Sequence, residues 1–217
     1  MELPLFPLRT VLFPGMALPL QIFEERYRTM VGELLETGGE FGVLLIREGN
    51  EVGGGAIPFD VGTTAVIERC QEIAGGRYLL TGRGQRRFRL LKMLPPRPYP
   101  YGEIEYVEER TPGPTPELTA AVEHVHEQFP QYFRLALSLT DQWARGMRLP
   151  DEPHALVDFL APWLQAAELE KQQLLEAEEA HERLQRLSAL LDQLLERTRN
   201  EAEEYRRRKH LGFGAAN

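Results

Sequence analysis

The sequence predicts an α+β protein in two lobes, and three features of the residue pattern support this. Residues 1–110 consist mainly of short apolar or alternating runs separated by glycine and proline, the pattern of short β-strands. Residues 117–209 instead repeat their apolar residues at helical spacing. Between the halves, residues 111–116 read TPGPTP, and three prolines in six residues cannot continue a helix or a central strand. We therefore expect a β-rich lobe at 1–110, a connector at 111–116, a helical lobe at 117–209 and a flexible tail at 210–217.

In the β-rich lobe, strand patterns alternate with turn signals. Apolar runs at 3–8 and 11–13 precede a turn at Pro14 and Gly15, and a third run at 17–22 leads into one helix at 24–36. That helix stops at Gly38 and Gly39. Further strands are predicted at 41–46, 61–69, 78–81, 88–91 and 101–107, with a mobile glycine-rich loop at 47–58 and a proline-rich loop at 93–101. Several short strands with one helix indicate a twisted, partly closed barrel.

The helical lobe begins with one or two helices, because Pro130 marks a kink or a break. A short helix is predicted at 153–164, and the pattern is strongly helical from residue 168 onward. This last stretch carries a seam with spacing 3-4-3-4, formed by Leu184, Leu187, Leu191, Leu194 and Thr198. Such a seam packs either inside a bundle or against a second copy of the chain, and we favour the bundle.

Composition excludes several classes of protein. The formal net charge of −8 disfavours non-specific nucleic-acid binding, because a phosphate backbone requires clustered cations. The single cysteine, Cys70, excludes an intrachain disulfide, and we interpret it as a small buried apolar residue. No apolar run reaches the roughly 18 residues of a membrane span, and no leader pattern opens the chain. We therefore expect a cytoplasmic protein that is a monomer or a weak homodimer.

One segment runs against the acidic balance. Residues 82–92 read GRGQRRFRLLK and carry the cations Arg83, Arg86, Arg87, Arg89 and Lys92 around Phe88. One interpretation is a nucleic-acid-binding strand with a stacking aromatic, which is our alternative function. We favour an ordinary strand that turns its arginines to solvent and Phe88 to the core.

No catalytic constellation is visible in the sequence. There is no GxxxxGK[ST] phosphate loop, no HExxH and no CxxC, and neither of the two serines lies in a nucleophile elbow. His124 and His126 lie two residues apart on a predicted helix, so they point to different sides. We therefore expect a protein that is not an enzyme and has no cofactor, no metal site and no catalytic residues.

Residues 3–31, LPLFPLRTVLFPGMALPLQIFEERYRTMV, resemble the opening of the N-terminal domain of Lon proteases, and more closely the small stand-alone proteins built from that domain. The resemblance continues through FGVLLI at 41–46 and returns at KQQLLE, residues 171–176. The phosphate loop of a Lon ATPase and the Ser–Lys pair of a Lon peptidase are both missing. The residues at signature positions, to which we assign mainly structural roles, are Pro7, Arg9, Pro14, Gly15, Glu24, Arg26 and Tyr27.

The resemblance implies a PUA-like pseudo-barrel followed by a helical bundle. It also implies a non-enzymatic module that binds unfolded polypeptide or a partner protein. For the contact surface we choose Arg97, Tyr99 and Tyr101 on the proline-rich segment, because Arg and Tyr are enriched among energetically important contacts. The alternative is that the two tyrosines pack over the edge of the barrel.

Overall fold

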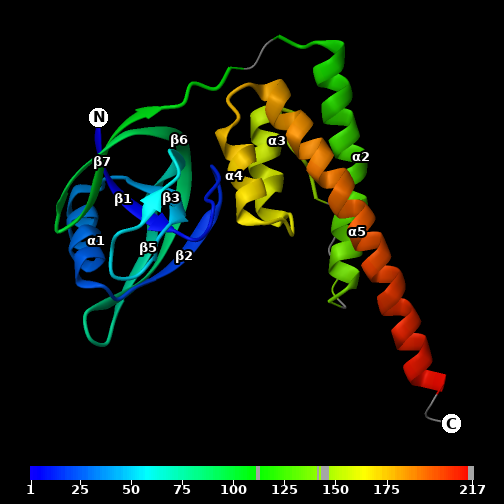
Figure 1. Ribbon diagram of the computed structural model, residues 1–217, viewed down its shortest axis with the longest axis horizontal. Helices are drawn as coiled ribbons and strands as arrows, with labels where there is room; N and C mark the ends of the chain where they lie inside the picture. The colour runs from blue at the N-terminus through cyan, green and yellow to red at the C-terminus, as the bar shows by residue number, and fades with distance from the viewer. Residues whose placement is uncertain (111–112, 141, 143–146, 215–217) are drawn as a thin grey trace. The chain divides into compact units, whose positions relative to one another are not determined.

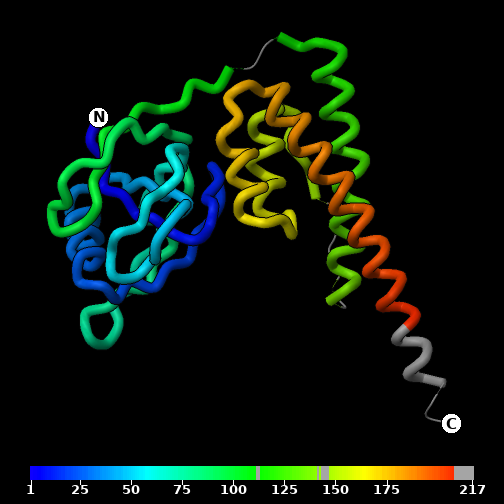
Figure 2. Tube along the Cα trace, viewed as in Figure 1, coloured from blue at the N-terminus to red at the C-terminus, as the bar shows by residue number. Residues whose placement is uncertain are grey.

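The computed structural model describes residues 1–110, 113–140, 142 and 147–214 (Figures 1 and 2). Side chains are described as far as residue 207. The chain divides into two compact units. The first, which we call the sheet unit, comprises Met1–Glu109 and Ala167–Glu178. The second, which we call the helical unit, comprises Arg110–Ala166 and Glu179–Asn217. The two units therefore confirm the predicted α+β class.

The sheet unit is built on seven strands, most of them antiparallel to their neighbours. Their bounds are β1 (Glu2–Leu8), β2 (Ala17–Ile22), β3 (Phe41–Glu48), β4 (Ile57–Pro58), β5 (Val61–Ile73), β6 (Arg77–Arg97) and β7 (Tyr99–Tyr106). The strand order is β1-β7-β6-β5-β3, and β1 also pairs in parallel with β3, so this path closes on itself. Because β2 and β4 lie outside the closed path and several pairings shift register, the sheet is barrel-like but is not a regular barrel.

Two predictions for this unit differ from the structure. Residues 11–13 form no strand: the Leu12 carbonyl accepts from the Thr63 hydroxyl at 2.6 Å, and the Phe13 carbonyl accepts from the Met16 backbone N–H at 3.0 Å. Conversely, the predicted loop at 93–101 is the end of β6 and the start of β7. The register shift between Leu94 and Arg97 accommodates Pro95 and Pro96, which have no N–H to give to a ladder.

The helix α1 (Glu25–Thr37) packs against the main core of the sheet unit. Its apolar face contributes Tyr27, Met30, Val31 and Leu34 to that core. It ends at Gly38, whose φ of 68° is left-handed and whose N–H bonds the Leu34 carbonyl. This confirms the predicted single helix and its glycine stop.

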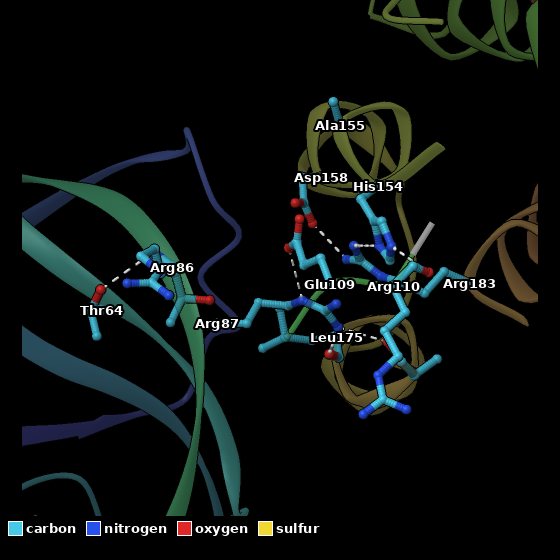
Figure 3. A network of polar contacts seen from close by, with 12 residues as sticks. Thr64, Arg86, Arg87, Glu109, Arg110, His154, Ala155, Asp158, Leu175 and Arg183 are labelled. Carbon is cyan, nitrogen blue, oxygen red and sulfur yellow. Dashed lines mark hydrogen bonds and ion pairs between the residues drawn. The ribbon is translucent and has the colours of Figure 1, made fainter. Parts of the chain in front are cut away.

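The helix α4 (Glu168–Glu176) belongs to the sheet unit, although its sequence lies between two parts of the helical unit. Arg87 on β6 is fully buried and donates to the carbonyls of Leu175 and Ala177 at 2.8 and 2.6 Å (Figure 3). These carbonyls lie at the C-terminal end of α4, where a helix lacks internal donors and carries partial negative charge. Glu109 adds an ion pair to Arg87 at 3.4 Å. Arg87 therefore anchors the end of α4 to the sheet.

Two further bonds hold the start and the middle of α4. The Glu168 carboxylate accepts from the Val11 backbone N–H at 2.6 Å. The buried Gln172 donates its amide to the Val61 carbonyl at 3.0 Å. Sequence pattern groups α4 with the later helices, but these polar bonds join it to backbone of the sheet unit, at Val11 after β1 and at Val61 in β5.

The helical unit contains α2 (Pro116–Ser138), α3 (Pro153–Leu160), the 3-10 turn η1 (Ala161–Trp163) and α5 (Ala180–Gly214). Thr115 caps α2, because its hydroxyl accepts from the Leu118 N–H at 3.2 Å. Pro130 lies inside α2, which is one continuous helix. The heptad seam of α5 is buried within this chain, where α5 packs on α2 and α3. No helix in the described part of the chain is long and apolar enough to cross a membrane.

A buried polar network joins α3 to α5 in the helical unit. Arg183 donates to Asp158 at 2.5 Å and to Nδ1 of His154 at 3.2 Å (Figure 3). Because a guanidinium has only donors, His154 must accept at Nδ1 and carry its proton on Nε2. That second nitrogen faces the Arg110 carbonyl at 3.4 Å. The network therefore holds the His154 ring between the buried Arg183–Asp158 ion pair and the Arg110 carbonyl.

Candidate functional site

Three of the signature residues organise the glycine-rich segment. The Arg9 side chain donates to a carbonyl of loop 49–53 at 2.7 Å, and its backbone N–H bonds the Glu51 carboxylate. Glu24 accepts from a backbone N–H of the same loop at 3.2 Å, while Arg26 donates to the Glu51 carbonyl. Glu24 and Arg26 also form an ion pair at 3.0 Å. Four hydrogen bonds therefore tie the loop, which the sequence predicts to be mobile, to Arg9 just after β1 and to Glu24 and Arg26 at the start of α1.

The other signature residues shape the backbone or fill the core. Pro7 is buried in β1, and Gly15 follows Pro14 in a turn with a φ of 76°. Tyr27 is buried with its ring centroid 4.1 Å from that of Phe6. Burial raises the pKa of the Tyr27 hydroxyl to about 12. The burial of Pro7 and Tyr27 and the positive φ of Gly15 are consistent with the structural roles that we assign to them.

The three predicted contact residues occupy different environments. Tyr99 is only 2% exposed, and its hydroxyl donates to Glu33 at 2.5 Å. Burial and the bond to Glu33 raise the Tyr99 pKa well above its ordinary range. Tyr101 is partly exposed and stacks on Tyr99, with ring centroids 5.1 Å apart. The Arg97 side chain is 68% exposed and forms an ion pair with Glu2 at 3.4 Å. Arg97 and Tyr101 are thus accessible, whereas the Tyr99 ring belongs to the core.

The arginines of residues 82–92 contact protein groups. Arg83 makes two bonds to Glu68, at 2.9 and 3.1 Å, and Arg89 pairs with Glu178. The Arg86 guanidinium lies 3.9 Å from the centroid of the Tyr106 ring. Together with the buried Arg87, these arginines are engaged within the sheet unit, which weakens the basis for a nucleic-acid-binding strand.

An open groove lies on a ribbon of three strands in the order β2-β6-β5. Strand register places side chains in rows across this ribbon, and two of the rows share a face. Their members are Pro19, Thr81 and Arg69 in one row and Gln21, Leu79 and Gln71 in the other. The row between them contains the buried Leu80, with Leu20 and Cys70 packed against the same core. Because side chains alternate along a strand, the two rows point outward. We call their six residues the outer groove.

The outer groove encloses about 470 Å³ and combines apolar and polar groups. Leu79 is 45% exposed at its centre, and Pro19 adds a second exposed apolar side chain. Amides, one hydroxyl and one guanidinium surround these two residues. An apolar centre with a polar rim is the usual composition of a surface that binds another chain. The groove can therefore hold an apolar side chain of a ligand while the rim bonds to polar groups.

The edge of β2 is less suited to binding than the face of the ribbon. In the described part of the chain, β2 pairs with β6 alone. Pro19 lies in the middle of β2 and has no N–H to offer to an added strand. A ligand would therefore contact side chains on the outer face rather than extend the sheet.

Sequence reasoning missed the outer groove, although one signal was present. The exposed Leu79 stands next to the buried Leu80, so residues 78–81 predict a strand without showing which leucine faces out.

No group of three metal-ligating side chains occurs among the residues that the structure describes.

Comparisons with known proteins point to one family. Residues 2–193 match the model of the ATP-dependent protease La (LON) substrate-binding domain. The chain is 27% identical over 199 residues to a Lon protease of Syntrophus aciditrophicus, covering 89% of this chain and 25% of that protein. It is 29% identical over 201 residues to Lon protease 2 of Herpetosiphon aurantiacus, covering 89% and 24%. The chain thus spans about a quarter of the length of these relatives.

Solved structures agree with this match. A Lon N-terminal domain protein from Xanthomonas campestris has a TM-score of 0.64 and 29% identity, covering 87% of this chain and 98% of that one. The N-terminal domain of Mycobacterium avium complex Lon protease has a TM-score of 0.62 and 21% identity, covering 88% and 98%. The second likeness concerns the fold alone.

Proposed function

The chain belongs to the family of Lon substrate-binding domains, and we propose that it is a non-enzymatic module that binds unfolded polypeptide. The observation that carries this proposal is the outer groove, where Leu79 and Pro19 are exposed within a polar rim. The family match supports it, because that match covers a substrate-binding domain and not a protease or ATPase part. A partner protein that presents an extended apolar segment would use the same surface.

Binding should be weak. A disordered chain loses conformational entropy when an ordered surface captures it, and this cost offsets part of the contact energy. We therefore expect dissociation constants in the micromolar range or weaker, without any need for nucleotide. The seam of α5 is buried within the helical unit, which supports a monomer as the binding species.

The test compares two leucines on the same strand. Leu79→Ser removes the apolar centre of the outer groove, and Leu91→Ser is the matched control because Leu91 is 52% exposed on β6 but does not line the groove. Binding of a labelled, permanently unfolded protein is measured by fluorescence anisotropy. We expect Leu79→Ser to weaken binding about fivefold or more, since half of a leucine side chain is available for burial. Leu91→Ser should change binding less than about twofold, because Leu91 lies outside the groove and buries no surface against the ligand.

Two outcomes would contradict the proposal in different ways. Absence of binding at high micromolar protein would refute the polypeptide-binding function. Binding that is insensitive to Leu79→Ser but weakened by Arg97→Ala and Tyr101→Ala would keep the function and move the site to the β6–β7 hairpin. Circular dichroism of each variant separates loss of contact from loss of folding.

A further inference from the structure

Arg69 differs from its neighbours because its charge is available to a ligand. It lines the outer groove and is exposed, and no described residue accepts a hydrogen bond from its side chain or forms an ion pair with it. Arg83 on the adjacent strand is bound in two places to Glu68. Arg77 in the same hairpin donates to the Ala74 carbonyl at 3.1 Å. Arg69 is therefore the cation on this face that can bond a ligand without losing an internal partner.

Nearby carboxylates do not neutralise Arg69. Glu68 is bonded to Arg83. Glu72 pairs with Tyr78 in a row that alternates with those of the outer groove, so its side chain leaves from the opposite face. The polar groups that share the face with Arg69 are uncharged amides and a hydroxyl. The groove thus presents one positive charge beside an apolar centre.

Strand register sets the spacing between that charge and the apolar centre. Thr81 lies opposite Arg69, and Leu79 lies opposite Gln71, so Leu79 and Arg69 are diagonal neighbours on adjacent strands. Diagonal neighbours are roughly 7–8 Å apart. In an extended ligand, side chains on one face recur every two residues, at about 6.6–6.8 Å. The distance from Leu79 to Arg69 therefore matches the distance between ligand side chains two residues apart. Adjacent ligand residues point to opposite faces, so they cannot contact Leu79 and Arg69 together.

We propose that the outer groove selects extended segments in which an apolar side chain and an aspartate or glutamate are separated by one residue. In this proposal the apolar side chain packs on Leu79 and the carboxylate bonds Arg69, which makes Arg69 the specificity-determining residue. The inference rests on the proposed polypeptide-binding function and adds the chemical pattern of the ligand. It also predicts that this chain, although its formal net charge is −8, favours ligands with a correctly spaced carboxylate.

The test uses four glycine- and serine-rich peptides that differ at their centres: Phe-Ser-Asp, Phe-Asp-Ser, Phe-Ser-Asn and Phe-Ser-Lys. Binding to the full chain is followed by shifts of backbone amide NMR signals, which detect weak complexes. We expect the Phe-Ser-Asp peptide to bind about three- to fivefold more tightly than the Phe-Ser-Asn peptide at low salt, as for a single exposed ion pair. Phe-Asp-Ser should show less than half of that gain, because its carboxylate faces away from Arg69.

Variants of Arg69 test the assignment directly. Arg69→Gln should abolish the preference for Phe-Ser-Asp, and Arg69→Glu should invert it in favour of Phe-Ser-Lys. Arg77→Gln is the matched control, because this arginine lies in the same hairpin but does not line the groove, and it should retain the preference. Rising salt should reduce the preference, since exposed charges are screened.

The outcomes separate this inference from the proposed function. Equal binding of all four peptides, or a preference that survives Arg69→Gln, would overturn the inference while leaving polypeptide binding intact. Failure of every peptide and of unfolded protein to bind would overturn both. A preference shared equally by Phe-Asp-Ser would refute the spacing argument.

Discussion

Replacing Arg87 with methionine should release α4 from the sheet unit. The substitution keeps most of the side-chain volume but removes the donors to the Leu175 and Ala177 carbonyls and the ion pair with Glu109. Replacing a buried ion pair with apolar residues can be neutral when both partners are removed. Here the two carbonyls stay behind without these donors, so the change should be destabilising.

The magnitude follows from the bonds that are lost. A hydrogen bond from a charged donor contributes about 1.5–3 kcal/mol net, and two of them are removed. Relief of the desolvation of the guanidinium offsets part of this loss, which leaves about 3 kcal/mol. Because each 1.4 kcal/mol is a tenfold change, the amide protons of Glu168–Glu176 should exchange about 100-fold faster.

Hydrogen exchange with mass spectrometry measures this effect segment by segment. Arg89→Met is the matched control on the same strand, because the Arg89–Glu178 pair is 37% and 51% exposed. An exposed pair of this kind contributes less than about 1 kcal/mol. Unchanged protection of α4 in Arg87→Met, or an equal loss of protection in Arg89→Met, would refute the anchoring role of Arg87.

Two further predictions concern the sheet unit. The pKa of Tyr27 is raised to about 12 by burial, so the stability that its neutral form contributes is present below pH 10 and is lost between about pH 10 and 12. We expect the free energy of unfolding, measured with a chemical denaturant from pH 10 to pH 12, to fall by about 2–3 kcal/mol less in Tyr27→Phe than in the native chain. An equal fall in both proteins would contradict the raised pKa of Tyr27. A methyl group at Gly84 would lie 2.2 Å from the Phe13 carbonyl oxygen, so Gly84→Ala should destabilise the unit by about 3 kcal/mol or more. Gly113→Ala, with open space around its added methyl group, should change the unfolding free energy by less than about 1 kcal/mol.

Local patterns in the sequence predicted most elements, because their causes are local. The glycine stop after α1 needs only a residue that adopts left-handed backbone, which Gly38 does with a φ of 68°. Alternation predicted β5 and the start of β6, and helical spacing predicted α2 and α5. The buried seam of α5 shows that the apolar stripe also identified its packing face correctly.

The candidate site depended on contacts between distant residues. Tyr99 and Tyr101 share one strand and one face, yet Tyr99 is buried against Glu33 while Tyr101 remains partly exposed. The pairing of β2, β6 and β5 brings Pro19, Leu79 and Arg69 onto one face from positions up to 60 residues apart. Periodicity reports which residues share a face of one element, but it does not report which face of another element lies beside it.

The sequence by itself determined the fold class, the family signature and most elements of both units, because apolar periodicity, proline and glycine act over a few residues. Only the tertiary structure decided that α4 packs with the sheet, that Arg87 is its buried anchor and that the Arg69 side chain has no partner among the described residues. Arginine has the same charge and the same donors at both positions. Folding brings carbonyl oxygens within hydrogen-bonding distance of Arg87, so its donors are used inside the protein, whereas the donors of Arg69 remain available to a ligand.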